Sequence, residues 1–452
     1  MECEFCLPDQ CSDGTFTDVT VLGNGKPIAS QIEQQHSNLA LDWRKRIVFK
    51  TRLKPGSVSR FDCTLKVLNR KPAITRRPRN GFYIFKNDIL DVRVNAATGL
   101  VDRYAVAGVN YLTQGAFCPL VLRDNEDPWE VSATAFGPVA GRFRLMDKTK
   151  GSRFSGLKNT IESVRVIEDG DVRTVIEAVL AYKESFICQR YALPKQGSEV
   201  MVETRVLWNQ KNSMLKLELP LAINAKRYLG HTAFGVQTLP MNGTEAVAQK
   251  WVCAADDANG LGLTCINDGI YGSDWCGNSI RPSLLRAPAY SAHPVGNAPT
   301  CPPDRFSPRI DQGEHIFRFW INAGNIDQRL RAVSAEAQVK NERPYALSFF
   351  PKGDGSQPKP VVVLDNQAIE LSCLKRAQND DGWVFRLFNT TDCKQSLRLR
   401  LPIAGVRSTC RFGRYEIKTF RLNSDGVLSE VNLLEEEAPD ACIYHNTMAG
   451  KS

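Results

Sequence analysis

Hydrophobic and polar residues alternate along many short stretches of the chain, and residues 199–208 show this most clearly. Every second residue from 200 to 208 belongs on one face of an extended strand: Val200, Val202, Thr204, Val206 and Trp208. Glu203 and Arg205 fall on the opposite face. Because successive side chains of a β-strand point to opposite faces, this pattern predicts a strand that buries one face.

Other short runs rich in β-branched or aromatic residues predict further strands, at 16–22, 47–53, 82–85, 89–94, 174–182 and 214–219. Turn-forming residues separate such runs at 97–99, 168–171 and 196–198. A helical period is hard to find except at residues 326–339. This combination predicts an all-β chain of tandem, packed antiparallel sheets rather than alternating β and α units.

Two linkers divide the chain, a segment rich in Pro and Arg at 71–81 and a second at 341–344. We therefore expect a small β-sandwich over residues 1–73, truncated at its amino end, and a large β-sandwich over residues 80–340. A third β-sandwich is expected over residues 343–432, followed by a disordered tail over 433–452. The Pro-rich residues 288–308 are expected to form a long loop within the large sandwich.

The composition is that of a globular protein, with 42% hydrophobic and 24% charged residues. No apolar run approaches the roughly 20 residues of a membrane helix, and the amino terminus lacks signal-peptide features, so we expect a cytoplasmic protein without membrane contact. The net charge of +9 is spread along the chain, and only two basic clusters stand out, at 43–46 and 70–79. Both are expected to be solvated, and no nucleic-acid partner is expected, because nucleic-acid binders carry a denser basic face with interleaved aromatic residues.

The sequence motifs of common reaction centres are absent: there is no GxSxG, no HExxH and no P-loop. The five histidines are not spaced to share a metal ion, and Cys3 and Cys6 form a CxxC without the second pair that a zinc site requires. We therefore expect a scaffold that holds no metal or other cofactor and whose cysteines are ordinary thiols.

Two polar segments allow either a structural or a functional interpretation. Asn267-Asp268-Gly269 follows an apolar run and is typical of a hairpin turn, but Asp268 and Tyr271 could also project from a strand end towards a sugar. The polar residues 311–315, which end at His315, precede an alternating run. A capped loop is favoured there over a ligand contact.

These segments resemble the carboxyl-terminal region of glycoside hydrolase family 38 α-mannosidases. The resemblance is carried, in matching order and spacing, by EAVAQKWV at 245–252, LTCINDGIYG at 263–272, SLLRAP at 283–288 and DQGEH at 311–315. It extends to 87–100, 361–371, 383–388 and 416–419, and so covers nearly the whole chain from Phe16 to Leu422. The bacterial and cytosolic branch of the family is more similar than the Golgi or lysosomal branch.

Members of this family have an amino-terminal catalytic domain with zinc, a nucleophilic Asp and an acid/base carboxylate, followed by a helical bundle and several β-sandwiches. The chain resembles the sandwiches alone, so the resemblance implies a galactose-mutarotase-like central sandwich without catalytic or metal residues. Zinc is expected only in the missing catalytic domain. By position, the resemblance implies that Asp268, Tyr271, Arg286 and His315 bind substrate at the edge of the sugar pocket.

The resemblance therefore implies the β-sandwich half of a retaining α-mannosidase that acts on mannose-containing glycans. It predicts a chain that is inactive alone and needs a separately encoded catalytic half. An apolar face exposed where that half docks would favour self-association. Two alternatives stay open, a fragment without function and a stand-alone carbohydrate-binding module whose stacking platforms would be Trp129, Tyr271, Trp275 and Trp320.

Overall fold

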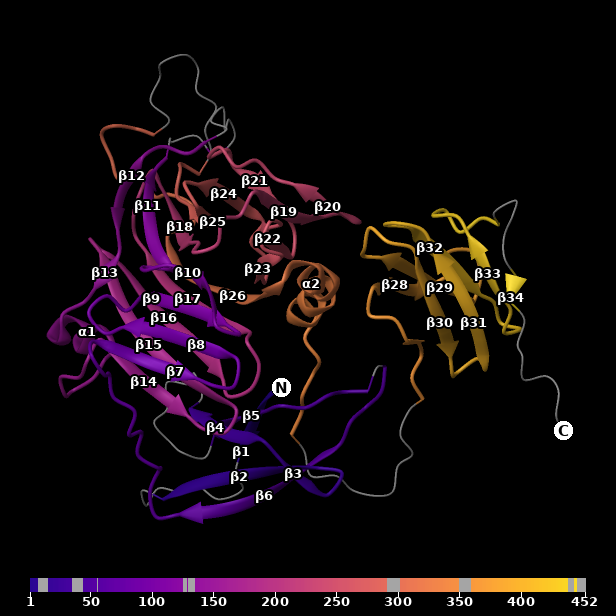
Figure 1. Cartoon of the computed structure of the whole chain (residues 1–452), viewed down its shortest axis with the longest axis horizontal. Helices are drawn as coiled ribbons and strands as arrows, with labels where there is room; N and C mark the ends of the chain where they lie inside the picture. The colour runs from indigo at the N-terminus through magenta and orange to yellow at the C-terminus, as the bar shows by residue number, and fades with distance from the viewer. Residues whose placement is uncertain are drawn as a thin grey trace.

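A computed structural model describes residues 1–6, 15–34, 44–54, 56–124, 128, 135–290, 301–348, 359–437 and 443–444 (Figure 1). Within these residues the chain is built from strands, with two helices. The predicted all-β class, with tandem antiparallel sheets, is confirmed. Neither helix of this part of the chain has the length and apolar character needed to cross a membrane.

Two three-stranded sheets face each other in the segment for which a small sandwich is predicted. The first has the order β1 (Glu2–Cys6), β5 (Arg44–Phe49), β4 (Ser30–Gln34). The second has the order β3 (Lys26–Ile28), β2 (Phe16–Gly23), β6 (Phe61–Leu68). Val19 and Val21 of β2 pack against Ile47 and Phe49 of β5, and this apolar contact joins the two sheets.

The central part of the chain contains a ten-stranded, a six-stranded and a four-stranded sheet. The ten-stranded sheet has the order β13 (Arg144–Leu145), β15 (Arg173–Tyr182), β16 (Ser185–Pro194), β17 (Val200–Trp208), β26 (Gly313–Asn325), β23 (Leu261–Asn267), β22 (Trp251–Asp256), β19 (Arg227–Thr232), β20 (Gly235–Thr238), with β14 (Val164–Asp169) also paired to β15. The six-stranded sheet has the order β12 (Val139–Arg142), β11 (Cys118–Arg123), β18 (Ser213–Pro220), β25 (Ser279–Arg286), β24 (Gly272–Cys276), β21 (Ala246–Val247). The four-stranded sheet has the order β10 (Val109–Leu112), β9 (Val101–Val106), β8 (Leu90–Asn95), β7 (Phe82–Lys86).

One apolar core unites these three sheets, and β17 shows how the sequence pattern builds it. Val200, Val202, Val206 and Trp208 are all 2% exposed or less, whereas Arg205 on the other face is exposed. The predicted alternation is therefore confirmed. Burying a valine-sized side chain stabilises the fold by roughly 1.5–3 kcal/mol, so a one-residue slip that turned all four outward is strongly disfavoured.

Helix α2 (Ile326–Asn341) packs on the outer face of the ten-stranded sheet and confirms the helix predicted at 326–339. Its N-cap is Asn325, whose side chain accepts a hydrogen bond from the backbone N–H of Gln328 at 3.2 Å. Val333 of the helix packs with Trp251 and Trp320 of the sheet. Helix α1 (Lys148–Phe154) was not predicted, because its seven residues are too few to show a period.

The carboxyl-terminal part forms two further sheets with a core of their own. A three-stranded sheet has the order β27 (Val363–Leu364), β30 (Gln395–Leu401), β31 (Val406–Phe412), and a five-stranded sheet has the order β28 (Ile369–Arg376), β29 (Trp383–Asn389), β32 (Ile417–Leu422), β33 (Leu428–Val431), β34 (Ile443–Tyr444). Phe388 meets Phe234 of the central part edge to face, with ring centroids 5.3 Å apart. β34, which falls within the tail predicted over 433–452, pairs with β33.

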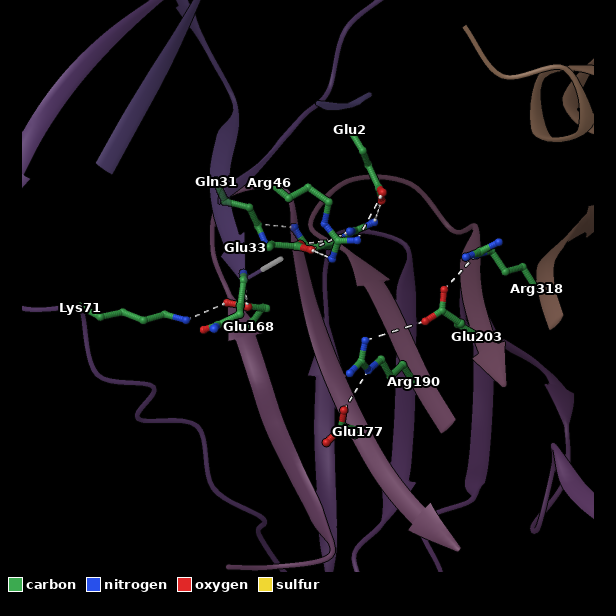
Figure 2. A network of polar contacts seen from close by, with 12 residues as sticks. Glu2, Gln31, Glu33, Arg46, Lys71, Glu168, Glu177, Arg190, Glu203 and Arg318 are labelled. Carbon is green, nitrogen blue, oxygen red and sulfur yellow. Dashed lines mark hydrogen bonds and ion pairs between the residues drawn. The ribbon is translucent and has the colours of Figure 1, made fainter. Parts of the chain in front are cut away.

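A charged contact joins the small sandwich to the ten-stranded sheet (Figure 2). The carboxylate of Glu33, on β4, accepts two hydrogen bonds of 2.7 Å from Arg173 of β15 and one of 2.8 Å from Arg46 of β5. Arg173 also lies 2.7 Å from Glu2 of β1. Burial alone would raise the pKa of Glu33, but the hydrogen bonds and charges of Arg173 and Arg46 outweigh burial and hold this pKa below its ordinary value.

Candidate functional site

The four residues predicted to line a sugar pocket lie on two different sheets. Asp268 directly follows β23 and His315 lies on β26, so both belong to the ten-stranded sheet. Tyr271 directly precedes β24 and Arg286 ends β25, so both belong to the six-stranded sheet. Each pair therefore has its own surroundings, described in turn below.

Asp268 is held by two arginines. One carboxylate oxygen accepts a hydrogen bond from the backbone N–H of Arg318 at 3.2 Å. The other lies 3.4 Å from the guanidinium of Arg318 and 3.5 Å from that of Arg343. Because these contacts neutralise the charge and occupy the acceptor sites of the carboxylate, Asp268 has little capacity left to accept a hydrogen bond from a sugar hydroxyl.

Tyr271 follows the turn that the sequence predicts. The side chain of Asn267 accepts hydrogen bonds from the backbone N–H groups of Gly269 at 3.0 Å and Ile270 at 2.9 Å, which confirms a turn. The turn is not the corner of a hairpin, because β23 and β24 on either side of it belong to different sheets. The backbone carbonyl of Tyr271 accepts from Ala248 at 2.8 Å. Since these bonds fix the backbone while the side chain stays 49% exposed, the ring is a positioned aromatic surface open to solvent.

His315 makes local contacts that fit the capped-loop interpretation. Its Nε2 lies 2.8 Å from the backbone carbonyl oxygen of Asp311. Its ring stacks almost parallel to that of Phe317, with centroids 6.0 Å apart and planes 8° apart. These contacts explain its place at the start of β26 without a ligand.

Arg286 holds the carboxylate of Asp124, which directly follows β11. Its guanidinium donates two hydrogen bonds to Asp124, of 2.7 and 2.9 Å, and lies 5.1 Å from the ring centroid of Phe136. Paired N–H donors match the two oxygens of a carboxylate, so this contact fixes the direction of the guanidinium plane. Arg286 is thus oriented on the outer face of the six-stranded sheet, beside an aromatic ring.

A cluster of buried polar side chains lies on the same sheet, and we call it the Lys216 cluster. It consists of Lys216 on β18, Glu245 before β21, Asp274 on β24, and Arg281 and Ser283 on β25. The side chain of Lys216 is fully buried and its ammonium contacts both Glu245 and, at 2.9 Å, Asp274. Arg281 donates two hydrogen bonds of 2.6 Å to Asp274, and Ser283 donates to Glu245. The cluster satisfies its buried charges internally, as burial requires.

Two of the predicted site residues flank the Lys216 cluster. Tyr271 adjoins Gly272, where an added Cβ would lie 2.9 Å from a carboxylate oxygen of Glu245. Arg286 lies on the same strand as Ser283. Glu245 is the more accessible carboxylate of the cluster, with its side chain 18% exposed against 1% for Asp274. The structure therefore brings Tyr271, Arg286 and Glu245 to one region of one sheet.

The sequence analysis did not find the Lys216 cluster. Lys216 lies within the run Leu215-Lys216-Leu217-Glu218-Leu219, and such a lysine is ordinarily solvated on the polar face of a strand. Its partners Glu245 and Asp274 are distant from it in sequence, and nothing in their local sequence pairs them with Lys216. Only the pairing of β18 with β25 and of β25 with β24 places these residues together.

A second polar feature crosses the outer face of the ten-stranded sheet, and we call it the charge row (Figure 2). Its members are in register on neighbouring strands: Arg165 on β14, Glu177 on β15, Arg190 on β16, Glu203 on β17 and Arg318 on β26. The distances in successive ion pairs along the row are 2.5, 2.8, 3.8 and 2.9 Å, and Arg318 also forms an ion pair with Asp268. Opposite charges directly across neighbouring strands stabilise a sheet, so the charge row is a structural brace.

Neither polar feature fits a metal ion. Among the residues that the structure describes, no three His, Cys, Asp or Glu side chains come together as metal ligands. The carboxylates of the Lys216 cluster and of the charge row face Lys or Arg side chains instead. A zinc site requires three or four Cys, His or carboxylate ligands, so these residues do not fit zinc.

The stacking platforms considered for a carbohydrate-binding module are largely buried. Trp275 and Trp320 are 3% and 5% exposed, because they pack into two apolar clusters of the central sheets. Trp129 lies outside the described residues. Of the other three residues, only Tyr271 has a ring that is exposed to solvent.

Comparison with known proteins gives a family match. Residues 85–304 match the family model of the glycosyl hydrolases family 38 C-terminal domain. An α-mannosidase of Saccharomyces cerevisiae is 24% identical over 319 residues, which cover 67% of this chain and 27% of the yeast protein. The chain therefore spans about a quarter of that relative.

Solved structures of two proteins from Enterococcus faecalis share the fold. A glycosyl hydrolase family 38 protein from Enterococcus faecalis aligns with a TM-score of 0.66 and 15% identity, over 90% of this chain and 52% of that one. An α-mannosidase from Enterococcus faecalis V583 aligns with a TM-score of 0.63 and 12% identity, over 93% of this chain and 53% of that one. A protein from Escherichia coli K12 and a galactose mutarotase related enzyme from Lactobacillus acidophilus also match, at TM-scores of 0.31 and 0.29, a likeness too distant to add to the fold assignment.

Proposed function

We propose that the chain is the β-sandwich half of an α-mannosidase, because residues 85–304 match the family model of the glycosyl hydrolases family 38 C-terminal domain. The observation that carries this proposal is the family match, supported by a fold alignment that covers 90% of this chain but only 52% of an Enterococcus faecalis family member. The chain then acts on the α-mannosides of glycans only together with a catalytic half. Zinc, the nucleophile and the acid/base carboxylate belong to that half.

Chemistry supports this division of labour. Retaining glycoside hydrolysis needs a free carboxylate nucleophile and a second carboxyl group that protonates the leaving oxygen, about 5–5.5 Å apart. In the Lys216 cluster both carboxylates are held by cationic groups, so neither is free for such a role. What this chain has to offer a sugar is a positioned surface that excludes water and holds the substrate.

Within that surface we assign the role of lining the sugar pocket to Tyr271 and Arg286 in preference to Asp268 and His315. The open ring of Tyr271 suits the apolar C–H face of a sugar, and Arg286 offers a guanidinium fixed by Asp124. Asp268 is neutralised by Arg318 and Arg343, which favours a structural role. We also propose a cytoplasmic location, which the eleven free cysteines among the described residues support.

Mixing tests the proposal. The purified chain is combined with a separately produced catalytic half of a family 38 α-mannosidase, and mannose release from an aryl α-mannoside is followed. We expect no release by the chain alone or by the catalytic half alone, and release by the co-purified mixture. Hydrolysis by the chain alone, or an inactive co-purified mixture, would contradict the proposal.

The same mixture tests the lining residues. Replacing Tyr271→Ala removes the exposed ring and is expected to raise KM about 3- to 10-fold with a smaller effect on kcat, as expected for a lost stacking contact. Asp268→Asn is the matched control, because its carboxylate faces Arg318 rather than solvent. An equal rise in KM for both variants would show that the assignment of Tyr271 is wrong.

A stand-alone carbohydrate-binding module is the second candidate, favoured by the exposed ring of Tyr271. Isothermal titration of the lone chain with manno-oligosaccharides separates the two candidates. Millimolar or tighter binding that disappears in Tyr271→Ala, without activity in the mixture, would favour the module. If the lone chain does not bind and the mixture is not active, the remaining candidate is a fragment without function.

A further inference from the structure

Strand β6 (Phe61–Leu68) presents an open sheet edge. It is the last strand of the order β3-β2-β6, and no strand of the described residues pairs with its other side. It runs along the lower margin of the molecule in Figure 1. On such an edge the backbone N–H and C=O groups of alternate residues point away from the sheet, and they can pair with another strand.

The opposite edge of the same sheet is closed by its sequence. Strand β3 has three residues, and Pro27 at its centre has no backbone N–H to donate. Strand β6, in contrast, has eight residues, contains no proline, and pairs with β2 in continuous register from Phe61 to Leu68 without a bulge. Short strands, prolines and bulges each protect sheet edges, and β6 has none of these three features.

The side chains of β6 are almost all exposed, on both faces. One face carries Cys63, Leu65 and Val67, and the two aliphatic residues are 41% and 64% exposed. The other face carries Asp62 and Lys66, one charge of each sign. An exposed strand with this much apolar surface favours a partner that covers it.

The sequence of β6 is complementary to itself. If two copies of β6 pair antiparallel about Thr64, residues whose numbers sum to 128 stand opposite each other. Asp62 then faces Lys66 of the second copy, and Lys66 faces its Asp62. On the other face Cys63 stands opposite Leu65, and Phe61 opposite Val67. A shift of two residues either way breaks both charge pairs, so charge selects this register.

The neighbouring strand extends the match. Asp18 of β2 lies opposite Lys66 within one chain. The pairing would therefore place each Lys66 between Asp18 of its own chain and Asp62 of the second copy. Opposite charges across neighbouring strands stabilise a sheet by roughly 0.2–1 kcal/mol per pair, and a two-fold axis supplies every pair twice.

We propose that β6 is a self-association strand, through which two copies of this chain join their small sandwiches into one continuous sheet. The occupant of the edge is a second copy, because both the charges and the apolar positions of β6 match their own reversal about Thr64. This inference concerns a surface remote in sequence from Tyr271 and Arg286, and it stands independently of the proposed function.

Sedimentation velocity over about 1 to 100 μM tests the proposal, since a single strand pair is a small interface that dissociates in this range. We expect the wild-type chain to shift from monomer to dimer. Lys66→Asp places like charges opposite each other twice and is expected to raise the dissociation constant at least about 10-fold. The double variant Asp62→Lys with Lys66→Asp restores opposite pairs and is expected to return to within about 3-fold of wild type.

Lys26→Asp is the matched control, because it makes the same charge change on the closed edge of the same sheet. Circular dichroism and thermal melting establish that every variant is folded. Leu65→Lys, which leaves Asp62 and Lys66 in place, is expected to weaken the dimer by covering the apolar face with charge. A wild-type monomer throughout, an unchanged dimer in Lys66→Asp, or no rescue in the double variant would each overturn the proposal.

Discussion

At the scale of single residues, His231 on β19 combines burial with an unmet hydrogen bond. The residue is 8% exposed, its ring stacks on that of Trp251 with centroids 5.9 Å apart, and its Nδ1 has no partner among the described residues. Burial, with the charge of Lys250 as a second cause, lowers the pKa of His231 to about 4. The folded protein therefore holds this histidine neutral where an unfolded chain would protonate it.

The lowered pKa of His231 predicts acid sensitivity. Between pH 6.5 and about 4 the unfolded state binds the proton and the folded state does not, so stability falls as pH falls through this window. His231→Phe keeps a ring on Trp251 and removes the titration. We expect wild type to lose up to about 2 kcal/mol more than the variant between pH 7 and pH 5.

Urea unfolding of both proteins at a series of pH values checks the expectation for His231. The difference in the free energy of unfolding between them should change across the window and stay constant above pH 7. Two curves that run parallel from pH 7 to pH 4 would contradict the assigned pKa.

At the scale of elements, helix α2 depends on its first turn. Asn325 caps the helix by accepting a hydrogen bond from Gln328. Asn325→Ala removes the acceptor and is expected to lower the free energy of unfolding by about 1 kcal/mol. Asn325→Asp is the matched control, since it keeps an acceptor at the N-cap. Equilibrium denaturation measures both, and equal losses in the two variants would show that the cap contributes little.

Much of the strand content could be predicted because alternation is a local property. The strands expected at 174–182 and 214–219 are β15 and β18, and the helix expected at 326–339 is α2, because a buried face repeats along each of them. The strand expected at 47–53 instead begins earlier, as β5 (Arg44–Phe49). Arg44-Lys45-Arg46 looks like a solvated cluster, yet Lys45 is buried, donates to the backbone carbonyl of Thr17 at 2.8 Å and lies over the ring of Phe16.

Strand pairing, in contrast, could not be predicted. β17 pairs with β26, so Glu203 meets Arg318 although the two lie far apart in sequence. The same holds for the Lys216 cluster, in which Glu245 precedes β21 and Asp274 lies within β24. Motif resemblance singled out Tyr271 and Arg286, and the structure places both beside this cluster. The ion pairs of Asp268 with Arg318 and Arg343, in contrast, depend on contacts that no local pattern contains. The lining role of the four predicted residues stays a prediction.

At the scale of the whole molecule, one arginine holds two parts of the chain together. Arg173 of the ten-stranded sheet contacts both Glu33 and Glu2 of the small sandwich. Arg173→Met leaves the buried carboxylate of Glu33 with Arg46 as its remaining cation. We expect the free energy of unfolding to fall by about 3 kcal/mol, because removing one partner of a buried ion pair leaves the other charge buried without that partner.

The loss in Arg173→Met should be concentrated in the small sandwich. Hydrogen exchange followed by mass spectrometry is expected to show faster exchange in residues 1–34 than in β15–β17. Arg398→Met is the control, because Arg398 pairs with Asp365 at a site where its side chain is 80% exposed and little stability is at stake. If hydrogen exchange became faster by the same factor over the whole chain, or if Arg398→Met had the same effect, a local role of Arg173 in holding the small sandwich would be contradicted.

The position of Pro27 sets a limit on assembly. A sheet with two open edges can recruit copies without end, and this is how fibrils grow. Here one edge of the small sheet ends in β3, where Pro27 interrupts the ladder, and among the described strands of this sheet only β6 is left to recruit another copy. When two copies have met through β6, the joined sheet is bounded by a proline at either end, so growth terminates at a pair and no filament follows.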